Sequence, residues 1–297
     1  TSTIVSVNNC PVCSILMAWG NDDQKAEWLR PLASGAMLGA FCLTEPQVGS
    51  EAAGLRTTAE RDGGDWVLNG VKQFITSGKH ADVAIVMAVT DRDAGKRGIS
   101  AFLVPTDAPG YVVARLEDKV GQHASDTAQI VFENCRVPAR NLIGERGQGY
   151  RIALSGLEGG RIGIASQSVG MARAAFEAAL AYSKEREAFG KPIGTFQNSR
   201  FKLAEMATEI EIGQTFIDRC VLALNEGELT AEEAAMAKWW CTELQGRVID
   251  TCVQLHGGHG YMNEYPIARA YADARVTRIY GGATEIMKEI IGRSMGF

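Results

Sequence analysis

The chain has 297 residues, 46% of them hydrophobic and 22% charged, with a formal net charge of −5. This length predicts about two domains with sizeable cores. The 30 basic and 35 acidic residues are interspersed, which argues against a nucleic-acid-binding protein, because such proteins gather Lys and Arg on one face. Apolar runs such as residues 83–89 are too short to cross a bilayer, so no membrane span is expected.

Residues 1–39 have the pattern of short helices. Asn21, followed by two aspartates, offers a side-chain cap for a helix over residues 24–32. The chain opens in mid-helix and without a methionine, so we interpret this region as the remnant of a larger N-terminal helical domain. Cys10 and Cys13 form a C-x-x-C pair without the further ligands of a zinc site, and the four histidines show no metal spacing. We therefore predict reduced cysteines and no metal site.

Residues 40–144 show the patterns of β-strands. The strongest signal is Asn69-Gly70 between two apolar runs, because Asn-Gly favours the tight turn of a hairpin. Further strands are predicted between Gly, Pro and Asp residues, at 82–90, 99–105, 112–116 and 128–132. No convincing helix interrupts them, which favours an antiparallel β-barrel or sandwich over a parallel βαβ sheet.

Residues 145–297 are helical by periodicity. Apolar residues at spacings of three and four define long stripes over 162–180, 203–224 and 237–255, and Gly257-Gly258 is expected to end the third helix. Shorter helices are predicted at 267–276 and 284–293. Long amphipathic helices with short connections pack against one another, so this region is predicted to be a helical-bundle domain.

Four segments carry more specific patterns, in the order 41–51 (FCLTEPQVGSE), 72–78 (KQFITSG), 186–194 (REAFGKPIG) with Gln197, and 254–261 (QLHGGHGY). Together they resemble the acyl-CoA dehydrogenase family of flavoproteins, closest in the C-terminal motif to its long-chain and short-chain-like branches. The resemblance covers essentially the whole chain. It implies an α+β multidomain fold with the helical remnant at 1–39, an antiparallel β-barrel middle domain at 40–144 and a C-terminal four-helix-bundle-type domain at 145–297.

The resemblance also implies a bound FAD. Its flavin edges are expected at two groups of strand residues, namely Phe41, Leu43 and Thr44, and Phe74, Ile75 and Thr76. Its pyrophosphate and adenine are expected at residues contributed by a neighbouring subunit, namely Arg186, Phe189 and Gln197, together with Gln254, Gly257 and Gly258. A shared cofactor site of this kind implies a homodimer or homotetramer.

The implied reaction is the α,β-dehydrogenation of an acyl-CoA thioester to the trans-2-enoyl-CoA, as in fatty-acid β-oxidation. Electrons are expected to pass to an electron-transfer flavoprotein, in the cytoplasm or the mitochondrial matrix. The residues implied in substrate binding are Ser50, Arg161, Tyr280, Gly281 and Gly282. Of these, the Gly281 N–H is expected to donate to the thioester oxygen.

A base that removes the α-proton is missing from both positions that the family uses. Gly281, after Tyr280, stands at one of them, and Gly160, before Arg161, at the other. Glu158 is the nearest alternative, but on a regular helix it points about 200° away from Gly160. It could act only if Gly159-Gly160 distorts the start of the helix.

Glu285 is the other candidate carboxylate, although the resemblance places it nearer the FAD. The missing base leaves three functions open: a dehydrogenase with a displaced base, a flavin-dependent acyl-CoA oxidase, and a homologue that binds FAD and acyl-CoA without catalysis.

Overall fold

The computed structural model describes residues 2–296, which divide into two compact units. Unit 1 contains the chain up to Lys119 and His123–Gly160, and unit 2 contains Val120–Gln122 and the chain from Arg161 onward. The boundary falls inside one long helix, α5 (Gly149–Glu185).

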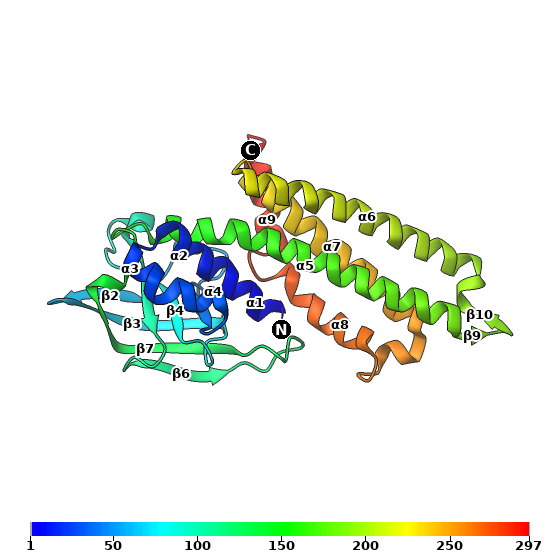
Figure 1. The fold of residues 1–297 in the computed structure, drawn as a ribbon, viewed down its shortest axis with the longest axis horizontal. Helices are drawn as coiled ribbons and strands as arrows, with labels where there is room; N and C mark the ends of the chain where they lie inside the picture. The colour runs from blue at the N-terminus through cyan, green and yellow to red at the C-terminus, as the bar shows by residue number, and fades with distance from the viewer. Residues whose placement is uncertain (1, 297) are drawn as a thin grey trace. The chain divides into compact units, whose positions relative to one another are not determined.

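The sheet of unit 1 is built from eight strands. They are β1 (Gly39–Cys42), β2 (Thr58–Asp62), β3 (Asp65–Thr76), β4 (Val83–Val89), β5 (Ile99–Pro105), β6 (Tyr111–Leu116), β7 (Thr127–Pro138) and β8 (Leu142–Ile143). Their order is β6-β7-β3-β2-β4-β5-β8, with β1 paired to β4 (Figure 1). The strands predicted from alternation lie where β4, β5, β6 and β7 are found.

The predicted antiparallel barrel is wrong in two respects. The sheet is mixed, because β1 runs parallel to β4 and β2 meets β4 in parallel at Thr58 and Val89. It is also open, because β6 and β8 stand at its two ends. After Tyr111 every residue of β6 is exposed, as suits an edge strand. Side chains alternate in the same way in parallel and antiparallel strands, so the sequence pattern carried no information on strand direction or closure.

The hairpin predicted at Asn69-Gly70 is also wrong. β3 continues through these residues, and the chain reverses instead at Gly63-Gly64, between β2 and β3. At Gly70 the ladder with β7 shifts register and φ is 150°. A Cβ at Gly70 would lie 2.5 Å from the Thr57 hydroxyl oxygen. The glycine therefore serves a close approach of two backbones at a bulge rather than a turn.

Each face of the sheet packs into its own core. The odd-numbered side chains of β4 lie in a cluster with the N-terminal helices and the start of α5, and the even-numbered ones lie in a cluster with Trp66 and Phe102. The rings of Trp66 and Phe102 meet edge to face at 5.3 Å. A strand that buries both faces reads as a continuous apolar run, which is how β4 and β5 read.

Short helical segments of residues 2–34 cover one face of this sheet. They are α1 (Ser2–Val7), η1 (Asn8–Cys13), α2 (Ser14–Trp19), α3 (Asp22–Gln24), η2 (Lys25–Leu29) and α4 (Arg30–Ser34). The cap predicted at Asn21 is confirmed. Its side chain accepts a hydrogen bond from the Gln24 N–H, and the Gln24 side chain accepts one from the Asn21 N–H. Cys10 and Cys13 are half-buried free thiols, and the other five cysteines are buried, also as free thiols.

Unit 2 is built of helices. They are the second part of α5, α6 (Gln197–Glu226), α7 (Ala231–His256), α8 (Pro266–Ala274) and α9 (Thr284–Ser294). A large core lies between α5, α6, α7 and α8, and a smaller one lies between α7 and α9. A small hairpin of β9 (Glu187–Ala188) and β10 (Lys191–Pro192) joins α5 to α6. In Figure 1, α5, α6 and α7 lie side by side, and their inward residues form one hydrophobic cluster. The predicted helices are therefore confirmed.

One residue of the third predicted apolar stripe does not lie on the buried face of α7. Trp240 lies within the predicted stripe over 237–255, at the helical spacing from Ala237 that predicts burial, yet 40% of its surface is exposed. The buried face of α7 instead includes Lys238, which is fully buried. Lysine is rarely fully buried in proteins. The apolar spacing pattern therefore did not include Lys238.

Candidate functional site

In unit 1, the structure brings segments 41–51 and 72–78 together. The Gln73 N–H donates to the Thr44 carbonyl at 2.9 Å. The Lys72 ammonium reaches the Glu45 carboxylate at 2.8 Å and the Leu43 carbonyl at 3.1 Å. The two chain segments predicted to line the flavin edges are thus tied to each other by backbone and side-chain bonds.

The Lys72–Glu45 ion pair is fully buried, with side-chain exposures of 0% and 1%. Burial lowers the pKa of Lys72, and the neighbouring carboxylate only partly opposes this. Burial by itself would raise the pKa of Glu45, but Lys72 and the hydrogen bonds from Thr57 and Arg56 lower it overall. The carboxylate accepts both of those bonds from backbone N–H groups, at 3.0 and 2.7 Å. The pair therefore holds the loop after β1 in one conformation.

Phe74 has an unusual backbone and an unusual exposure. Its φ is 60°, in the left-handed region that a bulky residue rarely adopts, and 63% of its surface is exposed. Ile75 is buried in the core of the sheet, and Thr76 is half-buried. Backbone strain of this kind persists where the surroundings enforce it, and it concentrates at binding sites. Phe74 thus presents an aromatic face to the outside of unit 1.

The other predicted residues of unit 1 lie in the first motif, on β1 and in the segment after it. Phe41 on β1 and Leu43 are partly buried against the core that includes the N-terminal helices. Thr44 is half-buried and Ser50 is exposed.

In unit 2, the turn between β9 and β10 carries Phe189. Phe189 and Gly190 have φ values of 52° and 76°, as in a type I′ turn, and 95% of the Phe189 surface is exposed. Arg186 precedes this hairpin and Gln197 opens α6, and both side chains are exposed. An exposed aromatic ring beside a forked guanidinium can hold a planar ring and a phosphate group.

The glycines at the end of α7 leave room for a ligand. No heavy atom lies within 4 Å of a Cβ built on Gly257 or Gly258, and φ at Gly257 is 60°. The following turn is η6 (Gly257–Tyr261). It is held by Tyr182, whose hydroxyl lies 2.9 Å from His259 Nδ1 and whose ring stacks on His256 at 4.4 Å. The contacts of Tyr182 therefore fix one side of η6, and Gly257 and Gly258 leave open space on the other.

Tyr280, Gly281 and Gly282 form a loop just before α9. The φ values of Gly281 and Gly282 are 64° and 102°. The Gly282 carbonyl accepts a hydrogen bond of 2.6 Å from the Lys238 ammonium. A Cβ at Gly281 would lie 2.5 Å from the Ile164 Cδ1. The conformation of the loop therefore depends on its two glycines, and a hydrogen bond from Lys238 ties the loop to α7.

The expected helix start at Gly159-Gly160 is wrong. α5 begins ten residues earlier, at Gly149, and runs without a break through Glu158 and Arg161. Glu158 is exposed and Arg161 is 6% exposed. The distortion on which a role of Glu158 depended is thus absent from this helix. Glu285 lies in the first turn of α9 and is exposed.

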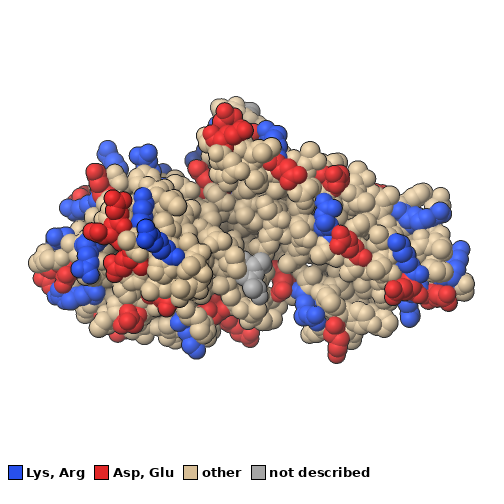
Figure 2. Space-filling model, viewed as in Figure 1, with Lys and Arg blue, Asp and Glu red and all other residues tan. Residues whose placement is uncertain are grey.

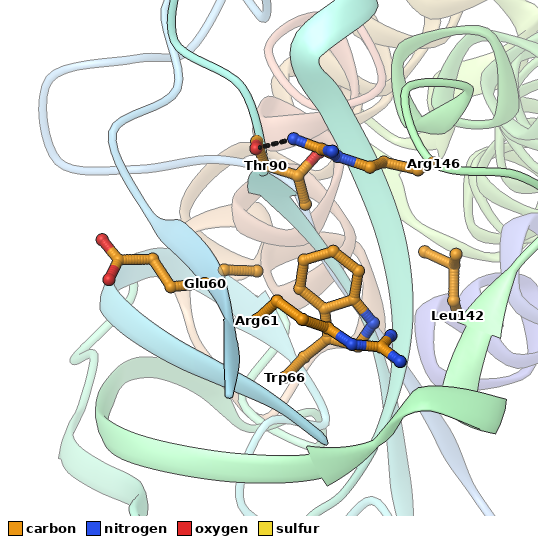
Figure 3. A pocket seen from close by; sticks show the side chains of 7 residues that line it. Glu60, Arg61, Trp66, Thr90, Leu142 and Arg146 are labelled. Carbon is orange, nitrogen blue, oxygen red and sulfur yellow. Dashed lines mark hydrogen bonds between the residues drawn. The ribbon is translucent and has the colours of Figure 1, made fainter. Parts of the chain in front are cut away.

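Two hollows on unit 1 do not contain the predicted cofactor residues. One, of about 520 Å³, is lined by Ala59, Glu60, Arg61, Trp66, Thr90, Leu142 and Arg146. In Figure 3, Arg146 donates to the Thr90 carbonyl at 2.6 Å, and Glu60 turns its carboxylate away from Trp66. The other, of about 450 Å³, lies beside the His80–Asp126 contact. Neither hollow is therefore assigned to the cofactor.

Charge and metal-ligand patterns add no other site. On the face that Figure 2 shows, acidic and basic side chains are interspersed. Within residues 2–296, no group of three His, Cys, Asp or Glu residues is arranged to hold a metal ion. Over the same residues, no helix has both the length and the apolarity to cross a membrane.

Sequence reasoning missed three functional candidates: Glu45, Lys72 and Lys238. Glu45 and Lys72 stand inside the recognised motifs, but neither was given a role. The signal for Lys238 was its spacing, because it falls four residues after Ala234 and three before Cys241 on the buried stripe of α7. A lone lysine on an apolar stripe indicates a charge that must find a partner inside the protein.

Comparison with known proteins agrees with this architecture. An open mixed sheet followed by a helical bundle defines an α+β protein. Residues 40–135 match the family model "Acyl-CoA dehydrogenase, middle domain", and residues 147–296 match "Acyl-CoA dehydrogenase, C-terminal domain". The chain therefore belongs to the acyl-CoA dehydrogenase family.

Individual relatives cover nearly all of this chain. It is 42% identical to the rat mitochondrial short-chain specific acyl-CoA dehydrogenase, over 98% of this chain and 71% of that protein. The structure described as the electron transferring flavoprotein of Acidaminococcus fermentans matches with 42% identity and a TM-score of 0.95, over 99% of this chain and 76% of that chain. Glutaryl-CoA dehydrogenase from Mycobacterium smegmatis in complex with FADH2 matches with 35% identity and a TM-score of 0.94, over 99% and 74%.

Proposed function

We propose that this protein is an FAD-dependent acyl-CoA dehydrogenase that converts an acyl-CoA thioester to the trans-2-enoyl-CoA. The observation that carries this proposal is the joining of segments 41–51 and 72–78 through the buried Lys72–Glu45 pair. Because a buried ion pair is a costly way to fix a loop, its presence beside Phe74 indicates that the conformation of this surface matters. Membership of the family makes a flavin the natural occupant.

The residues of each unit fit the parts of FAD. Phe74 offers an aromatic face at a strained backbone position, and Gly257 and Gly258 leave space for close approach of a dinucleotide. Arg186 supplies a forked donor for a phosphate, and the exposed Phe189 supplies a ring for stacking. When bound, the flavin would accept the hydride that leaves the β-carbon of the substrate. We propose that Arg186, Phe189 and Gln197 act on the FAD of a neighbouring subunit.

The Tyr280–Gly282 segment is the proposed thioester-binding loop. In this proposal the Gly281 N–H donates to the thioester oxygen, where negative charge develops as the α-proton leaves. In the same proposal Arg161 binds the CoA portion of the substrate, and Ser50 is a second substrate-binding residue. The loop itself contributes no carboxylate, because Gly281 and Gly282 have no side chains.

The proton acceptor is proposed to be Glu158, with Glu285 as the alternative. Glu158 is exposed on an unbroken helix, so its approach to substrate would need a change in α5. Replacing Glu158 by Gln tests this directly, since an active base would be lost with little change in shape. Unchanged flavin reduction in Glu158→Gln, and a loss in Glu285→Gln, would transfer the role to Glu285.

The absence of a carboxylate at Gly281 and Gly160 favours one other function, a homologue that binds FAD and acyl-CoA without catalysis. The two functions are separated by anaerobic titration of the FAD-loaded protein with butyryl-, octanoyl- and palmitoyl-CoA, following flavin absorbance. A dehydrogenase bleaches the flavin with one chain length preferred, and a passive binder shifts the spectrum without bleaching. If no thioester changes the spectrum, the proposed function is wrong.

The electron acceptor is proposed to be an electron-transfer flavoprotein. Oxygen consumption with substrate alone separates this from an acyl-CoA oxidase. A dehydrogenase turns over only when an acceptor is added, whereas an oxidase consumes oxygen without one.

A further inference from the structure

Lys238 is a fully buried lysine in the middle of α7. Its ammonium donates to the carbonyl of Gly282 at 2.6 Å, a short distance typical of charge-assisted hydrogen bonds. Isolated charges are costly to bury. A lysine at this position therefore needs a compensating partner, and its ammonium donates to the proposed thioester-binding loop.

The charges around Lys238 come from three helices. Burial and the neighbouring Arg161 on α5 lower its pKa to about 8, although Glu243 on α7 and Glu285 on α9 oppose the shift. Glu243 also engages Arg278 at 3.0 Å and accepts a hydrogen bond from the Thr284 hydroxyl at 3.2 Å. The lysine thus sits in a polar network that joins α7 to the start of α9.

The loop that Lys238 contacts is held at its start by the Tyr280 N–H, which donates to the Val276 carbonyl at 3.1 Å. Gly281 and Gly282 are glycines at positive φ, which leaves their backbone free to adopt several conformations. The N-cap of α9, Ala283, has no side-chain oxygen to cap the helix. A bond to the Gly282 carbonyl fixes the orientation of the Gly282–Ala283 peptide. It thereby holds the loop at a point one residue after the Gly281 N–H.

We propose that Lys238 is a positioning residue for thioester activation, holding the Gly282 carbonyl so that the Gly281 N–H points at the thioester oxygen. This inference rests on the proposed function. It assigns Lys238 no contact with substrate or flavin. Displacement of a catalytic donor by about 1 Å can cost about 100-fold in rate, and this sets the size of the expected effect.

The test uses three variants of the FAD-loaded protein. Lys238→Met keeps the length of the side chain without a donor, and Lys238→Arg keeps a charged donor. Lys288→Met removes an exposed lysine of α9 and serves as the matched control. Measured for each are FAD content, the affinity for crotonyl-CoA, the carbonyl stretching frequency of bound crotonyl-CoA, and the rate of flavin reduction by butyryl-CoA.

Lys238→Met is expected to retain FAD and reduce flavin about 100-fold more slowly. Its bound thioester carbonyl should absorb at a higher frequency, because the hydrogen bond to that oxygen is weakened. Lys238→Arg should recover most of both losses, and Lys288→Met should match the wild type. Equal rates and frequencies in Lys238→Met and the wild type would overturn the inference, as would a loss of FAD in both Lys238 variants without any frequency change.

The wild-type protein provides a second measurement that needs no variant. The ammonium predominates below pH 8 and the weaker amine donor above it, so the thioester frequency should rise as pH increases through about 8. In Lys238→Arg this transition should be absent. A pH-independent frequency would contradict the inference.

Failure of the two proposals can be told apart. If wild-type protein binds no acyl-CoA at any pH, both the proposed function and the inference fall. If it binds acyl-CoA without reducing flavin, the proposed catalytic activity is wrong. The affinity for crotonyl-CoA and its carbonyl frequency then still test the role of Lys238.

Discussion

At the residue scale, buried charge has the largest consequences at Glu45 and Lys72. Changing Glu45 to Gln leaves the Lys72 ammonium buried without its counter-charge, so we expect the free energy of unfolding to fall by about 3–5 kcal/mol. FAD affinity should fall as well, because the loop after β1 loses its anchor. Urea denaturation and FAD titration measure the two effects.

The control for this prediction is the double variant Glu45→Gln with Lys72→Met. Removing both charges should recover part of the lost stability, since no uncompensated charge remains. Glu289→Gln, which breaks an exposed i,i+4 pair with Arg293, should leave stability nearly unchanged. A double variant less stable than Glu45→Gln alone would show that the pair acts in another way.

Gly281 is the second residue whose identity can be tested for function. In Gly281→Glu, a carboxylate returns to one of the two usual base positions, and general-base catalysis is worth about 10²–10⁴ in rate. The new Cβ meets Ile164 Cδ1, so the change is paired with Ile164→Val. The positive φ of 64° at Gly281 strains any side chain there, and a Gln variant at the same position shares that strain. Stopped-flow reduction by butyryl-CoA should accelerate in the double variant. Gly281→Gln with Ile164→Val is the control, and an equal gain there would rule out base catalysis.

At the element scale, a substitution in the β9–β10 hairpin is expected to weaken FAD binding without changing the stability of the fold. Phe189 is 95% exposed, so Phe189→Ala should change the free energy of unfolding of the FAD-free protein by no more than about 0.5 kcal/mol. FAD retention should nevertheless drop, since the ring is the proposed stacking surface. Gel filtration followed by the ratio of flavin to protein absorbance measures retention.

Tyr271→Ala, a half-exposed aromatic on α8, is the matched control for the hairpin and should keep its FAD. If Phe189→Ala retains FAD as well as the wild type, the hairpin has no part in binding the cofactor.

At the scale of the whole molecule, the proposed sharing of the cofactor site between subunits would couple FAD binding to assembly. FAD at 100 times its dissociation constant should stabilise the folded protein by about 2.7 kcal/mol. If a neighbouring subunit supplies Arg186, the unfolding midpoint should also rise with protein concentration when FAD is present. Analytical ultracentrifugation with and without FAD should show the larger species favoured by the cofactor. Arg186→Ala should abolish that difference, and FAD binding to a monomer at full affinity would contradict a shared site.

The sequence alone determined the helices, most strands and the family. Helical stripes and the Asn21 cap are local, since their signals lie within one or two turns of the chain. The four motifs are also contiguous segments, so the family resemblance did not depend on the fold.

Strand direction, the open edge at β6 and the bulge at Gly70 depended on the tertiary structure, because they involve residues far apart in sequence. The same holds for Lys72 with Glu45 and for Lys238 with Gly282. A buried lysine finds its partner only when the fold brings a distant carboxylate or carbonyl to it, and no local pattern in the chain encodes that distance.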